Sequence, residues 1–296
     1  LVHSTYWISG LLASQLCSDH HLIQIHSVIS TSCERKRNGF SPVSSHQYES
    51  EQFFLPKVDR IISITESEYE LLIEKYHIEP HKIIVVGRTV ADCFLRPAHL
   101  PSGNLEQDVS VNYNTLASQD TGWWVNGAFC YIGRIVDQKC VKEIILAWEI
   151  LYKKYLDLTP PMWFIGGTAE DICKYRRIIK QYVPDLETYE KQHKIYWWGF
   201  LSAAGISNVL LKCNVLIMHS AFEPGGRVIL EAMSAGKPVI ATYSGFGNNY
   251  VQDWYNGFHV EYGDFEKLSR YLELFIINPY LSNMLGINSK NLFWKI

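Results

Sequence analysis

From Ala128 onward, the chain alternates short apolar runs with longer segments of helical periodicity. Between the first two runs, apolar residues recur at helical spacing from Val141 to Tyr155. Each run has the length of a buried strand, and the runs cover residues 128–132, 162–165, 195–198, 215–218, 239–241 and 258–260. Repeated strand–helix units predict a parallel sheet with helices on both faces, so the fold class is α/β.

A ligand site is expected where these strands end. In parallel sheets, ligands bind beyond the carboxyl ends of the strands. A small residue stands at four of these ends, namely Gly133, Gly166, Gly199 and Ser220. The loops that begin there are therefore predicted to converge on one rim of the sheet.

One of these loops leads into the most informative segment, residues 220–242, which reads SAFEPGGRVILEAMSAGKPVIAT. Glu223 precedes a predicted helix and Glu231 lies on it. Gly225 and Gly226 between them carry no side-chain bulk, so a ligand can approach the backbone closely. The helix start offers unpaired N–H groups that suit a phosphate. Carboxylates around an anion-binding helix start suit a ligand with both hydroxyls and phosphates, such as a nucleotide sugar.

A second anion-binding segment follows the Ala128 strand and reads GRIVDQK. Arg134 and Lys139 flank a strand-to-helix turn, where both side chains can reach the anion attracted by the helix after Gly226. Arginine offers a planar fork for phosphate oxygens and lysine a mobile point charge. The alternative interpretation of this segment is that the arginine and lysine are ordinary solvated side chains at a helix start.

These two segments resemble the motifs of retaining glycosyltransferases with the GT-B fold, the large group 1 family that includes sucrose-phosphate synthase and mycothiol- and mannoside-forming enzymes. The resemblance implies two Rossmann-like domains facing a cleft. It also implies that Arg134 and Lys139 clamp the donor diphosphate, and that Glu231 binds the ribose hydroxyls. Glu223 would hold sugar hydroxyls, and the backbone at Gly225, Gly226 and Arg227 would contact sugar or phosphate. Cys140 stands where the family usually has a glycine, and Gly225 where an aromatic residue is usual.

Further residues are assigned by the same resemblance. The loop Gly199, Phe200 and Leu201 would read the base through its backbone. His26, at the end of the run LIQIHS, would face the donor sugar, although a lone histidine after an apolar run is more often structural. The segment HSTYWISG resembles a family motif that lines the cleft, with Thr5 in place of its second histidine. No metal or other cofactor is implied.

The domain organisation follows from the pattern along the chain. Residues 1–110 are predicted to form a partial N-terminal acceptor-side domain, with a linker to about residue 127. Its strands are expected at 23–26, 60–64 and 82–86, and Thr65 with Glu68 forms a capping box. Residues 128–280 form the nucleotide-sugar domain and residues 281–296 a C-terminal tail. Because family strands that normally precede Leu1 are not found, the sequence is expected to be a fragment or an incomplete gene product.

Composition limits the remaining possibilities. A net charge of −3 gives no reason to expect a nucleic-acid partner. Seven cysteines without a Cys-x-x-Cys pair favour a reducing compartment, and so a cytoplasmic location. No apolar run reaches the length of a membrane span.

The resemblance thus implies a retaining, metal-independent hexosyltransferase. It would move a hexose or N-acetylhexosamine from a nucleoside-diphosphate sugar, with UDP favoured, to a hydroxyl of a small-molecule or glycan acceptor. One alternative is a GT-B-related phosphorylase or pseudo-glycosyltransferase. Another is an inactive nucleotide-binding fragment or a regulatory subunit.

Overall fold

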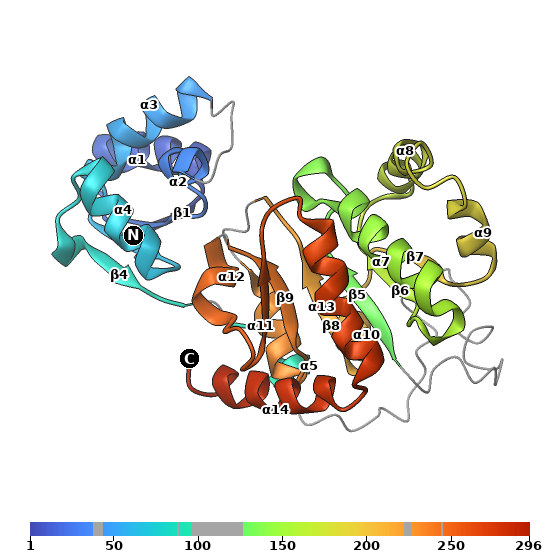
Figure 1. Cartoon of the computed structure of the whole chain (residues 1–296). Helices are drawn as coiled ribbons and strands as arrows, with labels where there is room; N and C mark the ends of the chain where they lie inside the picture. Colours follow the sequence, from blue (N-terminus) through green and yellow to red (C-terminus); the bar gives the residue numbers. More distant parts are fainter. Residues whose placement is uncertain (38–43, 88, 96–126, 222–225, 244) are drawn as a thin grey trace. The chain divides into compact units, whose positions relative to one another are not determined.

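The computed structural model of the chain describes residues 1–37, 44–87, 89–95, 127–221, 226–243 and 245–296. The chain divides into two compact units, one built mainly from residues 1–89 and the other mainly from residues 90–221, 227–243 and 247–296. Each unit contains its own parallel sheet (Figure 1). The expected linker to about residue 127 lies almost wholly outside the described residues.

The N-terminal unit is built on a four-stranded sheet in the order β1-β2-β3-β4. All neighbouring strands pair in parallel, and consecutive strands are neighbours, so right-handed crossovers place the connecting helices on one face. The strands are β1 (Val2–Thr5), β2 (Gln24–Ser27), β3 (Arg60–Ser63) and β4 (Ile83–Val85). The helices are α1 (Trp7–His20), α2 (Ser32–Arg37), α3 (Ser45–Phe54) and α4 (Glu66–Tyr76), with short 3-10 turns at Leu55–Lys57 and Pro80–Lys82.

The start of α4 shows how local sequence sets a helix boundary in this unit. The Thr65 hydroxyl accepts a hydrogen bond from the Glu68 backbone N–H at 3.1 Å, which is the predicted first half of a capping box. The Glu68 carboxylate accepts from the Ile64 N–H at 3.0 Å and the Ser63 hydroxyl, rather than from the Thr65 N–H. The predicted helix start is confirmed, and the reciprocal bond is displaced by one residue.

The C-terminal unit is built on a six-stranded parallel sheet in the order β10-β9-β8-β5-β6-β7. Strands predicted at 128–132 and 162–165 form with those bounds, and the other predicted strands form with shifts of one or two residues. The strands are β5 (Ala128–Ile132), β6 (Met162–Ile165), β7 (Ile195–Gly199), β8 (Cys213–Met218), β9 (Val239–Thr242) and β10 (Gly257–Val260).

Helices cover both faces of this sheet, as the sequence predicts. Crossovers that move toward β7 place their helices on one face, and crossovers that move toward β10 place theirs on the other. The helix α13 returns to pack beside α7 (Figure 1). The helices are α5 (Asp92–Leu95), α7 (Val141–Tyr155), α8 (Ala169–Ile179), α9 (Leu186–Lys191), α10 (Ala203–Lys212), α11 (Arg227–Ser234), α12 (Gly245–Tyr250), α13 (Phe265–Ile277) and α14 (Leu281–Phe293), with 3-10 turns η5 (Asp137–Lys139) and η6 (Leu156–Leu158).

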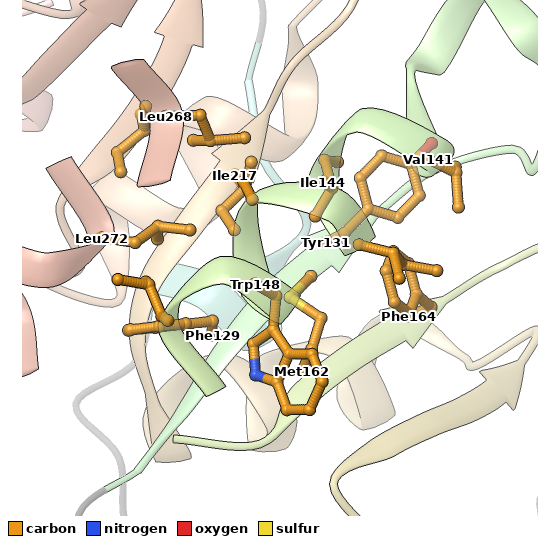
Figure 2. Packing of buried hydrophobic residues seen from close by; sticks show 14 of the residues in the cluster. Phe129, Tyr131, Val141, Ile144, Trp148, Met162, Phe164, Ile217, Leu268 and Leu272 are labelled. Atoms are coloured by element: carbon orange, nitrogen blue, oxygen red, sulfur yellow. The ribbon is translucent and has the colours of Figure 1, made fainter. Parts of the chain in front are cut away.

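The main hydrophobic core lies between the central strands and the pair α7 and α13. Figure 2 shows Trp148 and Ile144 of α7, with Leu268 and Leu272 of α13, packed over side chains of β5, β6 and β8. Trp148 is fully buried, and its indole N–H donates to the Pro160 carbonyl at 2.9 Å, so its one polar group is satisfied. Burying such a side chain contributes on the order of 1.5–3 kcal/mol, and this core holds the central strands in register.

The predicted C-terminal tail, residues 281–296, contains the helix α14, which packs against α11. Gly286 makes this packing possible, because a Cβ added there would lie 2.1 Å from the carbonyl oxygen of Gly236. Gly236 itself ends α11 with a φ of 68°, in the left-handed region that favours glycine.

The Gly286→Ala substitution should therefore destabilise the C-terminal unit, although alanine is the better helix former. We expect the free energy of unfolding to fall by about 1–3 kcal/mol, since backbone must shift to admit the methyl group. Urea unfolding followed by circular dichroism measures the change. Gly205→Ala in α10 is the matched control, because its added Cβ would lie no closer than 3.2 Å to a side-chain atom. Equal stability of the two variants would contradict the close packing.

Candidate functional site

The carboxyl ends of β5 and β8 form the topological switch point of the larger sheet. These strands are direct neighbours, with Tyr131 opposite Ile217, yet the chain leaves β5 toward β6 and leaves β8 toward β9. Connections that diverge in this way open a crevice beyond the two strand ends. The described residues that enter this region are 133–139 and 219–221, which belong to the two segments predicted to bind an anion.

Backbone contacts join the strand ends along this rim. The Gly133 N–H donates to the Ile165 carbonyl at 2.9 Å, and the Gly166 N–H donates to the Gly199 carbonyl at 2.6 Å. A Cβ at Gly166 would lie 2.3 Å from the Gly133 oxygen, so only glycine permits this approach. The prediction that Gly133, Gly166, Gly199 and Ser220 share one rim is confirmed by the strand order.

The turn after β5 is fixed from several sides. The Tyr131 hydroxyl donates to the Arg134 carbonyl at 2.6 Å, and the Tyr175 hydroxyl donates to the Asp137 carboxylate. The Gln138 carbonyl accepts from the Ala221 N–H at 2.8 Å, which ties this turn to the segment after β8. The two predicted anion-binding segments are thus in direct contact.

The two predicted cations of this turn differ in their surroundings. Arg134 is exposed, so its guanidinium can reach a ligand in solvent. Lys139, at the end of η5, is 7% exposed, so the residue is packed within the fold. Burial restricts where the side chain can point, which suits a fixed anion position better than a freely moving side chain would.

Cys140 follows these residues in a conformation that favours glycine. Its φ is 50° and its ψ is 37°, in the left-handed region, where it links η5 to the start of α7. The thiol is 3% exposed, and burial raises its pKa to about 12. Cys140 therefore keeps a backbone conformation that glycine would adopt without strain, and its Cβ adds strain.

Glu231, on α11, has an unpartnered carboxylate oxygen. The residue is 4% exposed, and its Oε1 lies 3.3 Å from Nε of Arg227, whose side chain is 65% exposed. Its Oε2 is buried and has no hydrogen-bond partner within the part of the chain that the structure describes. Burial raises the pKa of Glu231 to about 6, and Arg227 opposes this shift. A buried acceptor without a partner costs free energy, which a hydroxyl donor would recover.

The residues directly before α11 are only partly described. Glu223 and Gly225, both predicted site residues, lie outside the described residues. Gly226, the last residue before the helix, has a positive φ of 32°. The first N–H groups of α11 have no acceptor one turn earlier within the helix, so they provide an anion-binding end.

The predicted base-reading loop follows β7, two strands from β5 in the sheet. Gly199 ends the strand with a φ of 68°. Phe200 is 68% exposed, and Leu201 is half-buried. The Ser202 hydroxyl then accepts from the Gly205 N–H at 3.2 Å and starts α10, which fixes the end of the loop.

His26 belongs to the N-terminal unit, where it is buried. It is 2% exposed, its Nδ1 lies 2.9 Å from the Ser4 hydroxyl, and its ring packs edge-on against Phe54. Burial, and to a smaller degree the nearby His3, lowers the pKa of His26 to about 4, so the ring is neutral at neutral pH. His26 lies within β2, one residue before the strand ends, and these contacts give it a structural role.

His219 is a further polar residue at the switch point that the sequence motifs did not identify. It is fully buried, and its Nε2 lies 3.1 Å from both the Gly263 N–H and the Glu261 carbonyl. The imidazole thereby ties the turn after β10 to the end of β8. The available signal was a histidine directly after the apolar run VLIM, but it matches no known spacing of ligand residues.

The chain is similar to known proteins in sequence. The sequence pattern of the family described as glycosyl transferases group 1 matches residues 126–292. The D-inositol 3-phosphate glycosyltransferase of Streptomyces avermitilis is 25% identical over 300 residues, covering 97% of this chain and 60% of that protein. The chain spans less than two thirds of the length of the curated relatives it matches.

Solved structures share the fold. Sucrose-phosphate synthase of Thermosynechococcus elongatus superposes with a TM-score of 0.77 at 18% identity, over 99% of this chain and 68% of that one. Anabaena HepE, solved with UDP-glucose, superposes with a TM-score of 0.75 at 16% identity, over 99% of this chain and 74% of that one. The predicted α/β fold of the GT-B type is confirmed.

The described residues contain no group of three or more His, Cys, Asp or Glu residues placed to hold a metal ion. In the same part of the chain, no helix is both long and apolar enough to span a bilayer.

The strained backbone at Cys140 gives a testable expectation. Cys140→Gly and Cys140→Ala both remove the buried thiol, but only glycine adopts the left-handed conformation without strain. We expect Cys140→Gly to be more stable than Cys140→Ala by about 1 kcal/mol, measured by urea unfolding. If the alanine variant is as stable as the glycine variant, the turn does not hold this conformation in solution.

Proposed function

Because the chain belongs to the glycosyl transferases group 1 family, we propose that it moves a hexose or N-acetylhexosamine from a nucleoside-diphosphate sugar to an acceptor hydroxyl. The acceptor is a small molecule or a glycan. We propose further that the reaction retains the anomeric configuration, needs no metal ion and takes place in the cytoplasm, where the seven cysteines would stay free thiols, as they are in the structure.

The unpartnered oxygen of Glu231 is the observation that carries this proposal. Its burial beside Arg227 leaves one carboxylate oxygen without a donor among the described residues. A ribose offers two adjacent hydroxyls, which a carboxylate accepts with both oxygens. Ribose binding would therefore satisfy Oε2 and lower the raised pKa of Glu231, because a hydrogen bond to the charged form favours that form.

The diphosphate is assigned to Arg134, Lys139 and the first N–H groups of α11. The direct contact between Gln138 and Ala221 supports this assignment, since it holds the two segments at one place on the rim. As the bond to the anomeric carbon breaks, negative charge grows on the leaving phosphate and the sugar becomes oxocarbenium-like. Cations and N–H groups fixed in advance around that oxygen would lower the barrier without a metal.

The remaining donor contacts extend along the same rim. We assign the base to the backbone of Gly199, Phe200 and Leu201, and the exposed Phe200 ring offers an additional apolar surface to it. UDP is the favoured nucleotide because HepE, which shares the fold, was solved with UDP-glucose. The sugar hydroxyls are assigned to Glu223 and to the backbone at Gly225, Gly226 and Arg227.

His26 completes the proposed catalytic set. Since its ring is neutral, its contribution would be a hydrogen bond rather than a charge. With no second carboxylate assigned as a nucleophile, the hydroxyl would attack from the face that the diphosphate leaves, and the departing phosphate would accept its proton. That route gives a retained configuration.

The titration of Glu231 tests the ribose assignment. The pKa of about 6 means that the carboxylate is charged at neutral pH and becomes protonated as the pH falls through that value. UDP-glucose, which has no ionisation of its own in this range, should bind about tenfold more weakly one pH unit below the pKa, because only the charged form accepts with both oxygens. Calorimetry across this pH range measures the dependence.

Substitutions at Glu231 test whether this carboxylate causes the pH dependence of binding. Glu231→Gln should bind with little dependence on pH, and Glu231→Ala should lose about 1–3 kcal/mol of binding free energy at neutral pH. The control is Glu266→Gln, which replaces an exposed glutamate at the start of α13. This variant should bind UDP-glucose as the unaltered chain does. Unchanged affinity in Glu231→Ala would rule out the ribose assignment.

Stereochemistry and metal dependence test the reaction itself. Incubation with UDP-sugars and a panel of acceptors, followed by NMR of the product, should give the same anomeric configuration as the donor. Turnover should persist in excess EDTA, because the cationic side chains and N–H groups supply the charge stabilisation. An inverted product, or full loss of turnover in EDTA that added Mg²⁺ restores, would contradict the corresponding part of the proposal.

A further inference from the structure

One face of α14 exposes a continuous stripe of large apolar side chains. Tyr280 is 76% exposed, Met284 59%, Ile287 63% and Trp294 61%. Their spacing of four, three and seven residues keeps them on one side of a helix, with Asn291 between the last two. The opposite side of α14 is buried through Leu281, Leu285, Gly286 and Ser289. The stripe is therefore the outward face of a helix whose other side is packed.

The buried side holds α14 firmly in place. The Ser289 hydroxyl donates to the Asn256 carbonyl at 3.2 Å, and the Asn288 amide donates to the Tyr255 carbonyl at 2.8 Å. The Gly286 backbone lies against the carbonyl of Gly236. The stripe is thus presented as a fixed surface, and its side chains need no unfolding of the helix to contact a partner.

The charged side chains in the segment that contains the stripe are all positive. From residue 274 to 296 the chain contains no Asp or Glu, and it carries Lys290 and Lys295. Lys290 is exposed on α14 beside the stripe, and Lys295 is exposed in the turn that follows the helix. This local excess of positive charge stands out in a chain whose net charge is −3, and it complements an anionic partner.

A second apolar stripe, on α1, has no lysine or arginine beside it on the helix. Ile8, Leu12 and Leu16 are exposed by 52%, 68% and 46%, but α1 contains no Lys or Arg and carries Asp19. Exposed apolar surface alone does not identify its partner. The combination of apolar stripe, flanking lysines and aromatic residues near both ends is found on α14 and not on α1.

We propose that the outward face of α14 binds the surface of an anionic lipid bilayer. Met284 and Ile287 would enter the boundary between headgroups and acyl chains. Tyr280 and Trp294 would occupy the interface, where one edge of an aromatic ring stays near water. Lys290 and Lys295 would reach anionic headgroups while their stems cover apolar surface. The helix would lie along the bilayer plane, which places the C-terminal unit at a membrane surface.

The test is co-sedimentation of the full chain with vesicles. Vesicles of mixed phosphatidylcholine and phosphatidylglycerol should bind the protein, and vesicles of phosphatidylcholine alone should bind it far more weakly. Added salt should weaken binding to the anionic vesicles, since it screens the lysines. Absence of binding to the anionic vesicles at low salt would overturn the proposal.

Variants locate the binding surface. Ile287→Asp should weaken vesicle binding by at least about tenfold, because it places a carboxylate in the apolar stripe. The Lys290→Glu, Lys295→Glu pair should weaken binding to anionic vesicles by about tenfold or more and remove its salt dependence. The matched control is Leu158→Asp, because Leu158 is 67% exposed on η6 and lies outside the stripe. Circular dichroism confirms that each variant keeps its helix content.

Each other outcome argues against bilayer binding by α14. If Leu158→Asp weakens binding as much as Ile287→Asp does, the surface is not α14. If Ile8→Asp on α1 abolishes binding while Ile287→Asp leaves it unchanged, the apolar stripe of α1 is the membrane surface. If sedimentation equilibrium shows a dimer that Ile287→Asp separates, and vesicles bind neither form, the face of α14 pairs with a second copy of the chain.

Discussion

The parallel pairing of β5 with β8 determines most of what this chain can do. Strands that are distant in sequence meet there, with Tyr131 opposite Ile217, and the connections leave them in opposite directions. The crevice beyond their ends is therefore built into the topology, because no crossover can pass over it. The fully buried core over these strands, centred on Trp148 of α7, keeps them in register. Loss of this pairing would separate the two segments that contain the candidate site.

Around this crevice, the chain accepts local strain and unsatisfied groups that a purely structural domain would avoid. Cys140 holds a left-handed backbone despite its Cβ, and Glu231 keeps a buried oxygen without a partner in the described residues. Such costs are tolerated where a bound ligand recovers them. Both lie in segments that adjoin the switch point, whereas the core behind it is apolar and packed. This distribution supports a ligand site at the rim.

Much of this site was accessible from residue patterns. The strand–helix alternation gave the fold class, since buried strands and amphipathic helices have different periods. The positions of Arg134 and Lys139 after a strand, and of Glu231 on a helix, also followed from local spacing. The reciprocal bond of Glu68 to Ile64 in place of Thr65 did not, because a one-residue shift depends on the path of the chain after β3. His219 escaped notice for a similar reason, as its contacts at Gly263 are distant in sequence.

The sequence by itself determined the elements, the glycine positions at the strand ends and the residue types that suit a phosphate and a ribose. These properties depend on side-chain chemistry and on short-range periodicity. Only the tertiary structure decided that Glu231 has an oxygen without a partner among the described residues, that Lys139 is buried, and that the apolar side chains of α14 point outward. Burial and hydrogen-bond partners depend on which distant segments pack together, and a linear pattern does not contain that information.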